Sequence, residues 1–355
     1  VGINSLIARR LGAQRYEEAD LAASHGYRIS FFNWMFFALI GIFLSGPMMH
    51  MMSDTPYIVE NGEKYMFIIT VGSLFSIIQI TSEKILQSTG NMKIPMICSI
   101  AGAATNIILD PMFIFGVGPF PEMGVTGAAV ATIMGQFVSM CLGQYFLFAK
   151  EHAVHVKLRG WKVQGRILRD IYAVGAPAIL MQSITSVMQF GMNIILGNLT
   201  ETAVAVMGVY GRLQSFIFMP VFGLNQGVLP VMGFNYGARN RKRLMEAYKK
   251  GVFTALVIMG IGLILFQTIP HQLLAIFNST GNQAMYDIGV PALKTISICF
   301  LPAAFGIMTS SIFQAIGHGF LSLWGSLPAP DCIRRWRGTL AAASHNSEEP
   351  SVCRC

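Results

Sequence analysis

The feature that most constrains this 355-residue chain is a set of long segments without any Asp, Glu, Lys or Arg. These segments are 29–53, 65–82, 123–149, 171–200, 213–238, 251–286 and 295–330. One further segment, 94–118, contains Asp110 as its single charged residue. A helix needs about 20 apolar residues, at a rise of about 1.5 Å each, to cross a hydrocarbon core of about 30 Å. All of these segments are suitable, so the sequence predicts an all-α polytopic membrane protein.

The positions of the basic residues predict the same spans independently. We place the helices approximately at 29–52, 64–84, 94–117, 124–149, 170–196, 203–234, 252–269 and 288–317. Lys and Arg are concentrated near the chain start and in the loops around 83–93, 150–169 and 239–250, whereas the alternate loops contain Lys64 as their only Lys or Arg. Cytoplasmic loops of membrane proteins carry such an excess, so the basic loops are predicted to face the cytoplasm.

Composition and motifs exclude several classes of function. The chain is 53% hydrophobic and 12% charged, whereas soluble domains carry about 25% charged residues. The net charge of +8 does not indicate a nucleic-acid partner, because the basic residues occupy alternate loops and no basic run interleaves with aromatic residues. No His-Glu-x-x-His, phosphate-binding Gly-rich loop or Gly-x-Ser-x-Gly motif is present. We therefore expect no enzyme activity, no metal site and no cofactor.

The chain also contains an internal repeat at an offset of 225 to 227. The matched segments are Leu11-Gly12-Ala13 with Tyr236-Gly237-Ala238, Ala22 with Ala247, Gly26 with Gly251, and Leu86-Gln87-Ser88-Thr89-Gly90 with Phe313-Gln314-Ala315-Ile316-Gly317. The identities occur in order, at equivalent positions of the predicted cytoplasmic loops. The two halves are therefore predicted to have the same orientation. This arrangement is a parallel repeat, as found in transporters built from two lobes.

The repeat predicts a domain organisation. We expect a first lobe over 1–149, a basic cytoplasmic linker over 150–169, a second lobe over 170–323 and an aberrant tail over 324–355. Applying the offset to the start of the second lobe implies about 55 residues before Val1, so the first lobe would lack its first helix. The last two helices of the first lobe do not recur, so about eight full spans are present of an expected twelve. The tail is either an out-of-frame or divergent end, or a genuine cytoplasmic tail.

Several motifs, taken in order, resemble the multidrug and toxic compound extrusion (MATE) transporters over residues 1 to about 323. In the first lobe they are Ala8-Arg9-Arg10-Leu11-Gly12-Ala13, Leu86-Gln87-Ser88-Thr89-Gly90-Asn91, Asn106-Ile107-Ile108-Leu109-Asp110-Pro111-Met112-Phe113-Ile114-Phe115-Gly116 and Gly124-Val125-Thr126-Gly127-Ala128-Ala129-Val130-Ala131-Thr132. In the second lobe they are Pro220, Gly223, Gln226-Gly227, Pro230 and Asn235-Tyr236-Gly237-Ala238. The resemblance implies a V-shaped pair of six-helix lobes around a central cavity, in the inner (plasma) membrane of a bacterium.

The resemblance also implies a function. It implies a monomeric multidrug efflux antiporter that exports cationic or amphipathic small molecules, xenobiotics among them, in exchange for H⁺ or Na⁺ by alternating access of its two lobes. The chain departs from the family pattern in its acidic residues. The Asp expected in the first helix is absent, and the predicted helices 170–196 and 288–317 contain no Asp or Glu beyond Asp170. The second lobe therefore offers no clear carboxylate for ion coupling.

Asp110 is the only carboxylate deep within a predicted span. An ionised carboxylate at mid-membrane costs about 2.5–3.5 kcal/mol on insertion scales, so it must face a cavity or a partner, or be protonated. Asn106 lies one turn earlier on the same helix face, and Pro111 frees a backbone carbonyl nearby. Asp110 and Asn106 are therefore our ion-coupling candidates, for H⁺ or Na⁺. The alternative is that they only pin neighbouring helices by hydrogen bonds.

Five polar residues of the second lobe are candidates for the substrate cavity. Gln182, Gln189 and Asn193 are spaced by seven and four residues and so share one helix face. They either contact substrate or form interhelical hydrogen bonds. Arg212 and Lys294 lie in the outer parts of their helices. Each is either a counter-ion or gate, or a side chain that extends to the membrane interface.

A group of glycines and a proline is predicted to interrupt the helix at 203–234. Gly223, Gly227 and Pro230 are candidate hinge residues, and Gln226 among them is a further cavity candidate. Broken helices near the membrane midplane often expose backbone where substrate binds or lobes bend. The alternative is a kink with only a packing role.

Three other functions remain open. A flippase for lipid-linked saccharides is one, because a related superfamily shares the two-lobe design. That function would favour a strongly cationic cavity, for which only Arg212 and Lys294 are candidates. A membrane-embedded enzyme or receptor is another, and the missing catalytic motifs and the repeat argue against it. The last is an inactive transporter fragment with exposed packing faces.

Overall fold

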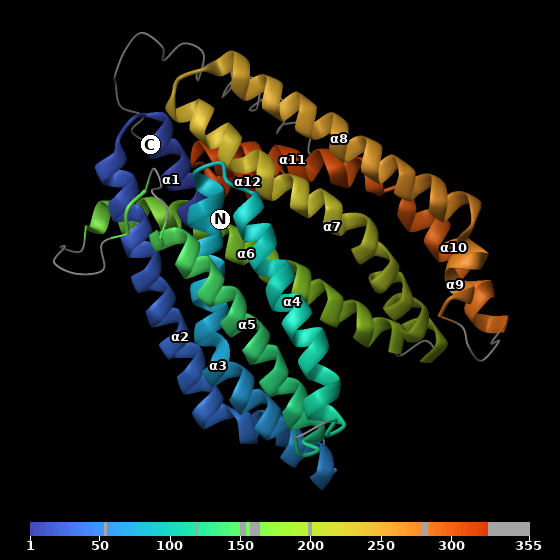
Figure 1. Cartoon of the computed structure of the whole chain (residues 1–355). Helices are drawn as coiled ribbons and strands as arrows, with labels where there is room; N and C mark the ends of the chain where they lie inside the picture. Colours follow the sequence, from blue (N-terminus) through green and yellow to red (C-terminus); the bar gives the residue numbers. More distant parts are fainter. Residues whose placement is uncertain are drawn as a thin grey trace. The chain divides into compact units, whose positions relative to one another are not determined.

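The computed structural model describes residues 1–52, 55–117, 120–149, 154–156, 164–197, 201–277 and 283–325. Every regular element in these ranges is an α-helix (Figure 1). The helices are α1 (Gly2–Gly12), α2 (Tyr16–Met52), α3 (Pro56–Ser88), α4 (Lys93–Ile114), α5 (Gly124–Ala149), α6 (Gly165–Gly197), α7 (Glu201–Gly237), α8 (Arg241–Thr268), α9 (Pro270–Ala275), α10 (Gln283–Ser297), α11 (Phe300–Ile316) and α12 (Gly319–Gly325). The predicted tail lies outside the described residues, apart from its first two positions.

The helices confirm the predicted class of fold. Seven of them are long and apolar enough to cross a membrane, and α10 with α11 forms an eighth span if this bent pair is one unit. Large apolar side chains remain exposed along these helices. On α2 they include Phe31, Phe32, Phe36, Phe37 and Phe43. A continuous apolar surface of this kind is unfavourable in water and favourable against lipid tails, as expected for a spanning helix.

The predicted eighth span, 288–317, is wrong in one respect. The chain forms two helices that meet at an angle of 45° instead of one straight helix. Pro302 lies in the first turn of α11 and has no N–H to donate to the Ile298 carbonyl. The Cys299 N–H donates instead to the Ile296 carbonyl at 3.0 Å, which ends α10 in a tight turn.

Helices extend beyond the apolar segments that predicted them. α8 begins at Arg241, although its charge-free segment begins at residue 251. Asn240 caps this helix, because its side-chain oxygen accepts a hydrogen bond from the Arg243 N–H at 3.1 Å. Charge marks the depth at which a helix leaves the hydrocarbon, whereas capping marks where the helix ends. The predicted spans are therefore shorter than the observed helices.

The chain divides into two compact units, which are described separately. Unit 1 comprises Val1–Gln14 and Arg169–Cys355, and unit 2 comprises Arg15–Leu168. The first residues of the chain thus pack with the second half of the sequence, whereas the repeat assigns them to the first lobe. The lobe boundaries predicted from the repeat remain a prediction.

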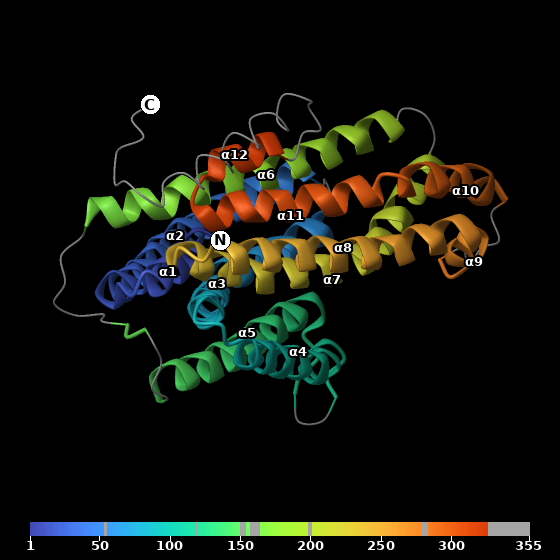
Figure 2. The ribbon, with the colours of Figure 1, turned by 90° about the horizontal axis from the view of Figure 1, so that it is seen from above.

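Unit 2 is a bundle of four long helices. α3 packs against both α2 and α5, and α4 packs against α5 (Figures 1 and 2). A polar cluster joins three of these helices. The Tyr27 hydroxyl lies 2.7 Å from Ser82 Oγ and donates to Gln144 Oε1 at 3.0 Å. Side chains of α2 also hold the described part of the predicted linker, because Asp20 accepts the His155 N–H at 2.7 Å.

Unit 1 has an apolar core between α7, α8, α10 and α11, which lie together in Figure 2. Phe266 and Phe300 are almost fully buried, with ring centroids 5.2 Å apart in an edge-to-face arrangement. Met259 and Met308 are fully buried beside them. α1 packs against α7 and α11, so a short helix from the chain start is part of this unit.

The repeat is visible in the backbone of two matched turns. Gln14 and Arg239 are separated by the predicted offset of 225, and they are the non-glycine residues with positive φ in the described chain, at 59° and 56°. Each N–H donates to the carbonyl three residues earlier, that of Leu11 or Tyr236, at 3.0 Å. The two copies thus share a conformation that L-residues rarely adopt.

A second pair of turns ends α3 and α11. Gly90 and Gly317 have φ values of 85° and 93°. The residue after each glycine donates to the carbonyl five residues earlier, at 3.2 Å and 2.9 Å respectively. This is the hydrogen-bond pattern of a helix that ends at a left-handed glycine. The agreement confirms the repeat that the sequence identities predicted.

The two copies of the Gly-Ala turn lie against each other in unit 1. A methyl group on Gly12 would overlap the Phe234 carbonyl, and one on Gly237 would overlap the Arg9 carbonyl. Arg9 and Phe234 are themselves a matched pair at the offset of 225, so the contact is reciprocal. α1 and α7 therefore cross about a local two-fold axis, with no side chain between their backbones. We call this contact, formed by Gly12, Gly237 and the two carbonyls, the glycine seam.

Two arginines tie α1 to neighbouring helix ends. Arg9 Nη1 donates to the Ile316 carbonyl in the last turn of α11, at 3.1 Å. Arg10 pairs with Asp170 in α6 at 2.9 Å, and the two side chains are 19% and 33% exposed. Burial, followed by the charge of Arg10, lowers the pKa of the Arg9 guanidinium. α1 is thus fixed by both backbone contact and charge.

Candidate functional site

The structure brings the two predicted ion-coupling residues together on α4. Asn106 Nδ2 donates to Asp110 Oδ1 at 3.2 Å, and both residues are partly buried. Pro111 follows inside the same helix, so the Ile107 carbonyl cannot accept the usual intrahelical hydrogen bond from that position. A carboxylate, an amide and a carbonyl oxygen therefore lie within about one turn of helix. Their proximity is confirmed, and their role in ion coupling remains a prediction.

The crossing of α4 and α5 holds this site in place. A methyl group on Gly102 would lie 2.8 Å from the Gly135 carbonyl oxygen. One on Gly135 would lie 2.7 Å from the Gly102 carbonyl oxygen and 3.1 Å from Asn106 Cβ. Backbone atoms, not flexible side chains, thus set the distance between the two helices. Asn106 packs directly on this crossing, and Asp110 follows one turn later.

Two of the three predicted cavity residues of α6 lie on an exposed part of that helix. Gln182 and Gln189 are exposed, whereas the side chain of Asn193 lies outside the described residues. Between described residues, neither glutamine side chain forms the interhelical hydrogen bond that was the alternative interpretation. A role in contacting substrate therefore remains a prediction for all three.

The predicted interruption near Gly223 and Pro230 is wrong, because α7 is continuous from Glu201 to Gly237. Pro230 cannot donate to the Gln226 carbonyl, nor Pro220 to that of Phe216, and membrane helices tolerate such losses. Figure 1 shows α7 curving along its length. Methyl groups on Gly223 or Gly227 would meet nothing within 4 Å, so α7 has open space at these two positions. A hinge in an unbroken helix remains a prediction.

The two basic candidates are not joined to each other. Arg212 on α7 and Lys294 on α10 are both exposed. The Lys294 backbone carbonyl accepts a hydrogen bond from Gln267 Nε2 at 2.8 Å, but no ion pair of either side chain occurs among the described residues. The structure thus provides no concentrated positive site at these positions.

Polar contacts between α7, α8 and α11 were missed from the sequence. Ser311 Oγ donates to Asn225 Oδ1, which joins α11 to α7 next to the predicted cavity residue Gln226. The Tyr248 hydroxyl lies 3.0 Å from Thr309 Oγ1, which joins α8 to α11. The run of hydroxyl residues in an otherwise apolar α11 was the signal that could have revealed this polar strip.

A second carboxylate of unit 2 was also missed. Glu83 accepts hydrogen bonds from Gln79 Nε2 at 3.1 Å and from Ser99 Oγ at 2.7 Å, so it joins α3 to α4. It lies at the end of its predicted span, where a search for mid-membrane carboxylates does not find it. Within the described ranges, no group of three His, Cys, Asp or Glu residues could hold a metal ion.

Spanning helices and a repeated half define a polytopic membrane protein built from two repeats. The chain belongs to the MatE family, whose model matches residues 1–112 and 177–324. This is a family of transporters, so the protein is not an enzyme. It is an integral protein of the bacterial inner membrane, as its apolar helices and bacterial relatives indicate.

Curated relatives are similar over most of the chain. The multidrug export protein MepA of Staphylococcus aureus strain N315 is 27% identical over 326 residues, which cover 90% of this chain and 69% of that protein. The protein of the same name from Staphylococcus saprophyticus is 26% identical over 319 residues, with the same shares covered.

Solved structures of the same family are also similar. A crystal structure of MATE in the bent conformation superposes with a TM-score of 0.89 and 25% identity, covering 98% of this chain and 84% of that one. An outward-facing multidrug resistance MATE transporter of the MOP superfamily gives a TM-score of 0.81 and 29% identity, covering 91% and 71%.

Proposed function

We propose that this protein is a secondary active exporter that exchanges cationic or amphipathic small molecules for H⁺ or Na⁺. The similarity to proteins named multidrug export proteins, at 26–27% identity over 90% of the chain, supports export of small molecules. The family membership supports a mechanism in which two lobes alternate access to a central site. We propose further that the protein works as a monomer.

The observation that carries this proposal is the pair of Asp110 and Asn106 within α4. A carboxylate in a spanning helix is costly when ionised, so binding of a cation or a proton strongly changes its free energy in the membrane. Such a group can alternate between an ion-bound and an ion-free state. Coupling follows if the ion-free, charged state is the one that binds a cationic substrate.

The groups around Asp110 suit either coupling ion. With H⁺, the neutral carboxyl group keeps a hydrogen-bond partner in the Asn106 side chain. With Na⁺, the carboxylate, the Asn106 amide oxygen and the Ile107 carbonyl would provide hard oxygen ligands of the kind that transporters use. The carbonyl is available because of Pro111.

The glycine seam supports the alternating-access part of the proposal. It joins matched positions of the two repeats, Gly12 and Gly237, through backbone atoms alone. A contact without interlocking side chains can separate and re-form without rotamer changes.

The test is transport by the full chain in proteoliposomes with an imposed H⁺ or Na⁺ gradient, with ethidium as the fluorescent cation. Asp110→Asn is expected to reduce gradient-driven transport at least tenfold, because its side chain can neither bind a proton nor neutralise Na⁺. Asp287→Asn is the matched control. It removes an exposed carboxylate from α10 and is expected to leave the rate unchanged.

The same assay separates the alternatives. Transport by Asp110→Asn at the wild-type rate would leave this pair only a packing role. A wild-type protein that moves a lipid-linked saccharide and not ethidium would be a flippase. Failure of the wild-type chain to transport any of these compounds would support an inactive protein and contradict the proposal.

A further inference from the structure

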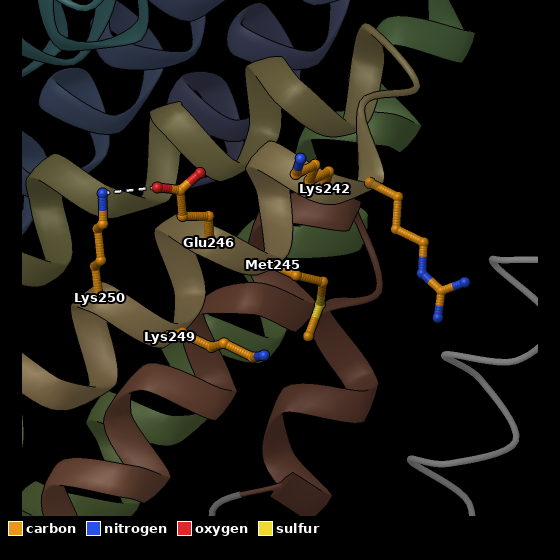
Figure 3. A pocket seen from close by; sticks show the side chains of 6 residues that line it. Lys242, Met245, Glu246, Lys249 and Lys250 are labelled. Carbon is orange, nitrogen blue, oxygen red and sulfur yellow. Dashed lines mark ion pairs between the residues drawn. The ribbon is translucent and has the colours of Figure 1, made fainter.

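The first turns of α8 present basic side chains outside the site described above. Two adjacent rows at i, i+4 spacing line an open groove of about 750 Å³: Arg241, Met245 and Lys249 form one, and Lys242, Glu246 and Lys250 form the other. Figure 3 shows these side chains spread over one side of the helix. We call this surface the basic groove.

Positive charge in the basic groove is only partly balanced. Glu246 pairs with Lys250 at 2.7 Å, as the dashed line in Figure 3 marks. Arg241, Lys242 and Lys249 are exposed, and none of them has an ion-pair partner among the described residues. A surface with unpaired cations around one apolar side chain, Met245, attracts an anion.

A second, apolar groove of about 220 Å³ adjoins the basic groove between α7 and α8. It shares Lys250 with the basic groove, and its other lining residues include Leu224, Gly227, Val228, Val231, Gly251 and Thr254. Gly227 leaves space on the α7 side of this groove. A methyl group on Gly227 would meet nothing within 4 Å, so this side of α7 is open.

The depth of the two grooves is set by the sequence. The charge-free segment 251–286 begins directly after Lys250, so the basic groove lies where α8 leaves the hydrocarbon. Thr254 lies about 6 Å further along the helix, at a rise of about 1.5 Å per residue. A ligand that filled both grooves would thus be anionic at the headgroup level and apolar below it.

We propose that the two grooves together bind one anionic phospholipid of the cytoplasmic leaflet. Its phosphate would lie against Lys242, Lys249 and Lys250, and one acyl chain would lie between α7 and α8. Phosphatidylglycerol has this chemistry. Free phosphate has no group for the apolar groove, and an acidic peptide would not extend into the hydrocarbon alongside Thr254.

The test is lipid binding to the purified full chain in detergent, measured by native mass spectrometry during titration with dioleoyl phosphatidylglycerol. The wild-type protein is expected to bind it at least tenfold more tightly than dioleoyl phosphatidylcholine. The double variant K242Q/K249Q is expected to bind phosphatidylglycerol about 25-fold more weakly, because each basic residue near a membrane contributes about fivefold.

A matched control removes the same charge from the same end of α8 and the residues just before it. Arg239 and Arg243 do not line either groove. Arg239 has a φ of 56°, which Asn tolerates. The variant R239N/R243Q is therefore expected to bind phosphatidylglycerol within about twofold of wild type. Equal weakening by both double variants would show non-specific attraction and overturn the proposal.

A second pair of variants tests the acyl-chain groove. Thr254→Phe fills the groove and is expected to weaken phosphatidylglycerol binding about tenfold, whereas Thr268→Phe, at the exposed far end of α8, is expected to change nothing. Unchanged binding by Thr254→Phe would overturn the acyl-chain part. If inorganic phosphate displaced phosphatidylglycerol as effectively as added phosphatidylglycerol does, the ligand would not need to be a lipid, and that choice would be overturned. Because this is a binding assay, its result does not depend on whether the protein transports ethidium.

Discussion

Gly90 and Gly317 end helices at matched positions of the repeat, yet their surroundings differ. Both have positive φ, at 85° and 93°. A methyl group on Gly90 would meet nothing within 4 Å, whereas one on Gly317 would overlap the guanidinium of Arg9. The local sequence therefore determines the turn, and α1 determines what covers it. The repeat conserves backbone conformation more strictly than it conserves packing.

The largest effect is expected where the matched positions touch each other. Gly12→Ala or Gly237→Ala would each destabilise the protein by about 3 kcal/mol, because the added methyl meets backbone carbonyls that cannot rotate away. The melting temperature of the purified protein in detergent measures this. Gly211→Ala on the same α7 is the control, since its methyl meets nothing within 4 Å. Equal melting temperatures for Gly237→Ala and Gly211→Ala would show that the seam is not closely packed.

A smaller effect is expected from the two helix-ending glycines. Gly90→Ala should lower the free energy of unfolding by about 1 kcal/mol, because Ala is strained in the left-handed conformation. Gly317→Ala should cost about 2 kcal/mol, because the methyl also displaces Arg9 from the Ile316 carbonyl. When Arg9 is already replaced by Gln, adding Gly317→Ala should therefore cost no more stability than Gly90→Ala does in the wild-type protein. Identical costs for the two glycine variants would contradict a covering role for Arg9.

The smallest effect is expected from ion pairs that differ in exposure. Arg10→Gln should destabilise the protein by about 1 kcal/mol, since Arg10 and Asp170 are largely shielded from water. Lys64→Gln, which breaks the exposed pair with Glu60 at 2.8 Å, should cause no measurable change. Thermal unfolding at low and high salt measures both. A larger loss at Lys64 than at Arg10 would reverse this part of the comparison.

The fold was largely predictable because its determinants are local. A charge-free segment of about 20 residues can cross the membrane only as a helix or as part of a barrel. The break between α10 and α11 was not predicted, although Pro302 was visible in the sequence. A proline inside an apolar segment is either accommodated within a continuous helix, as Pro230 is within α7, or lies in the first turn of a new helix, as Pro302 does in α11. Packing against other helices decides between these outcomes, and the sequence of one segment does not contain that information.

In the candidate site, too, contacts within one helix were predictable from the sequence and contacts between helices were not. Asn106 and Asp110 are four residues apart, so the helix alone brings them together. Ser311 and Asn225 are separated by 86 residues, and their contact depends on how α7 and α11 pack. Glu83 was overlooked because it lies at the end of its predicted span, and its contact with Ser99 also depends on how α3 and α4 pack.

The glycine seam affects how far the two halves can diverge. A contact between backbones requires only that two positions lack a side chain, and it leaves the flanking residues free to change. Leu11 and Tyr236 differ in size and chemistry, yet each flanks the same turn. A duplicated sequence can therefore lose almost all of its internal identity and keep the axis that relates its copies. In this chain, the clearest trace of that duplication is preserved by the residues with the smallest side chains.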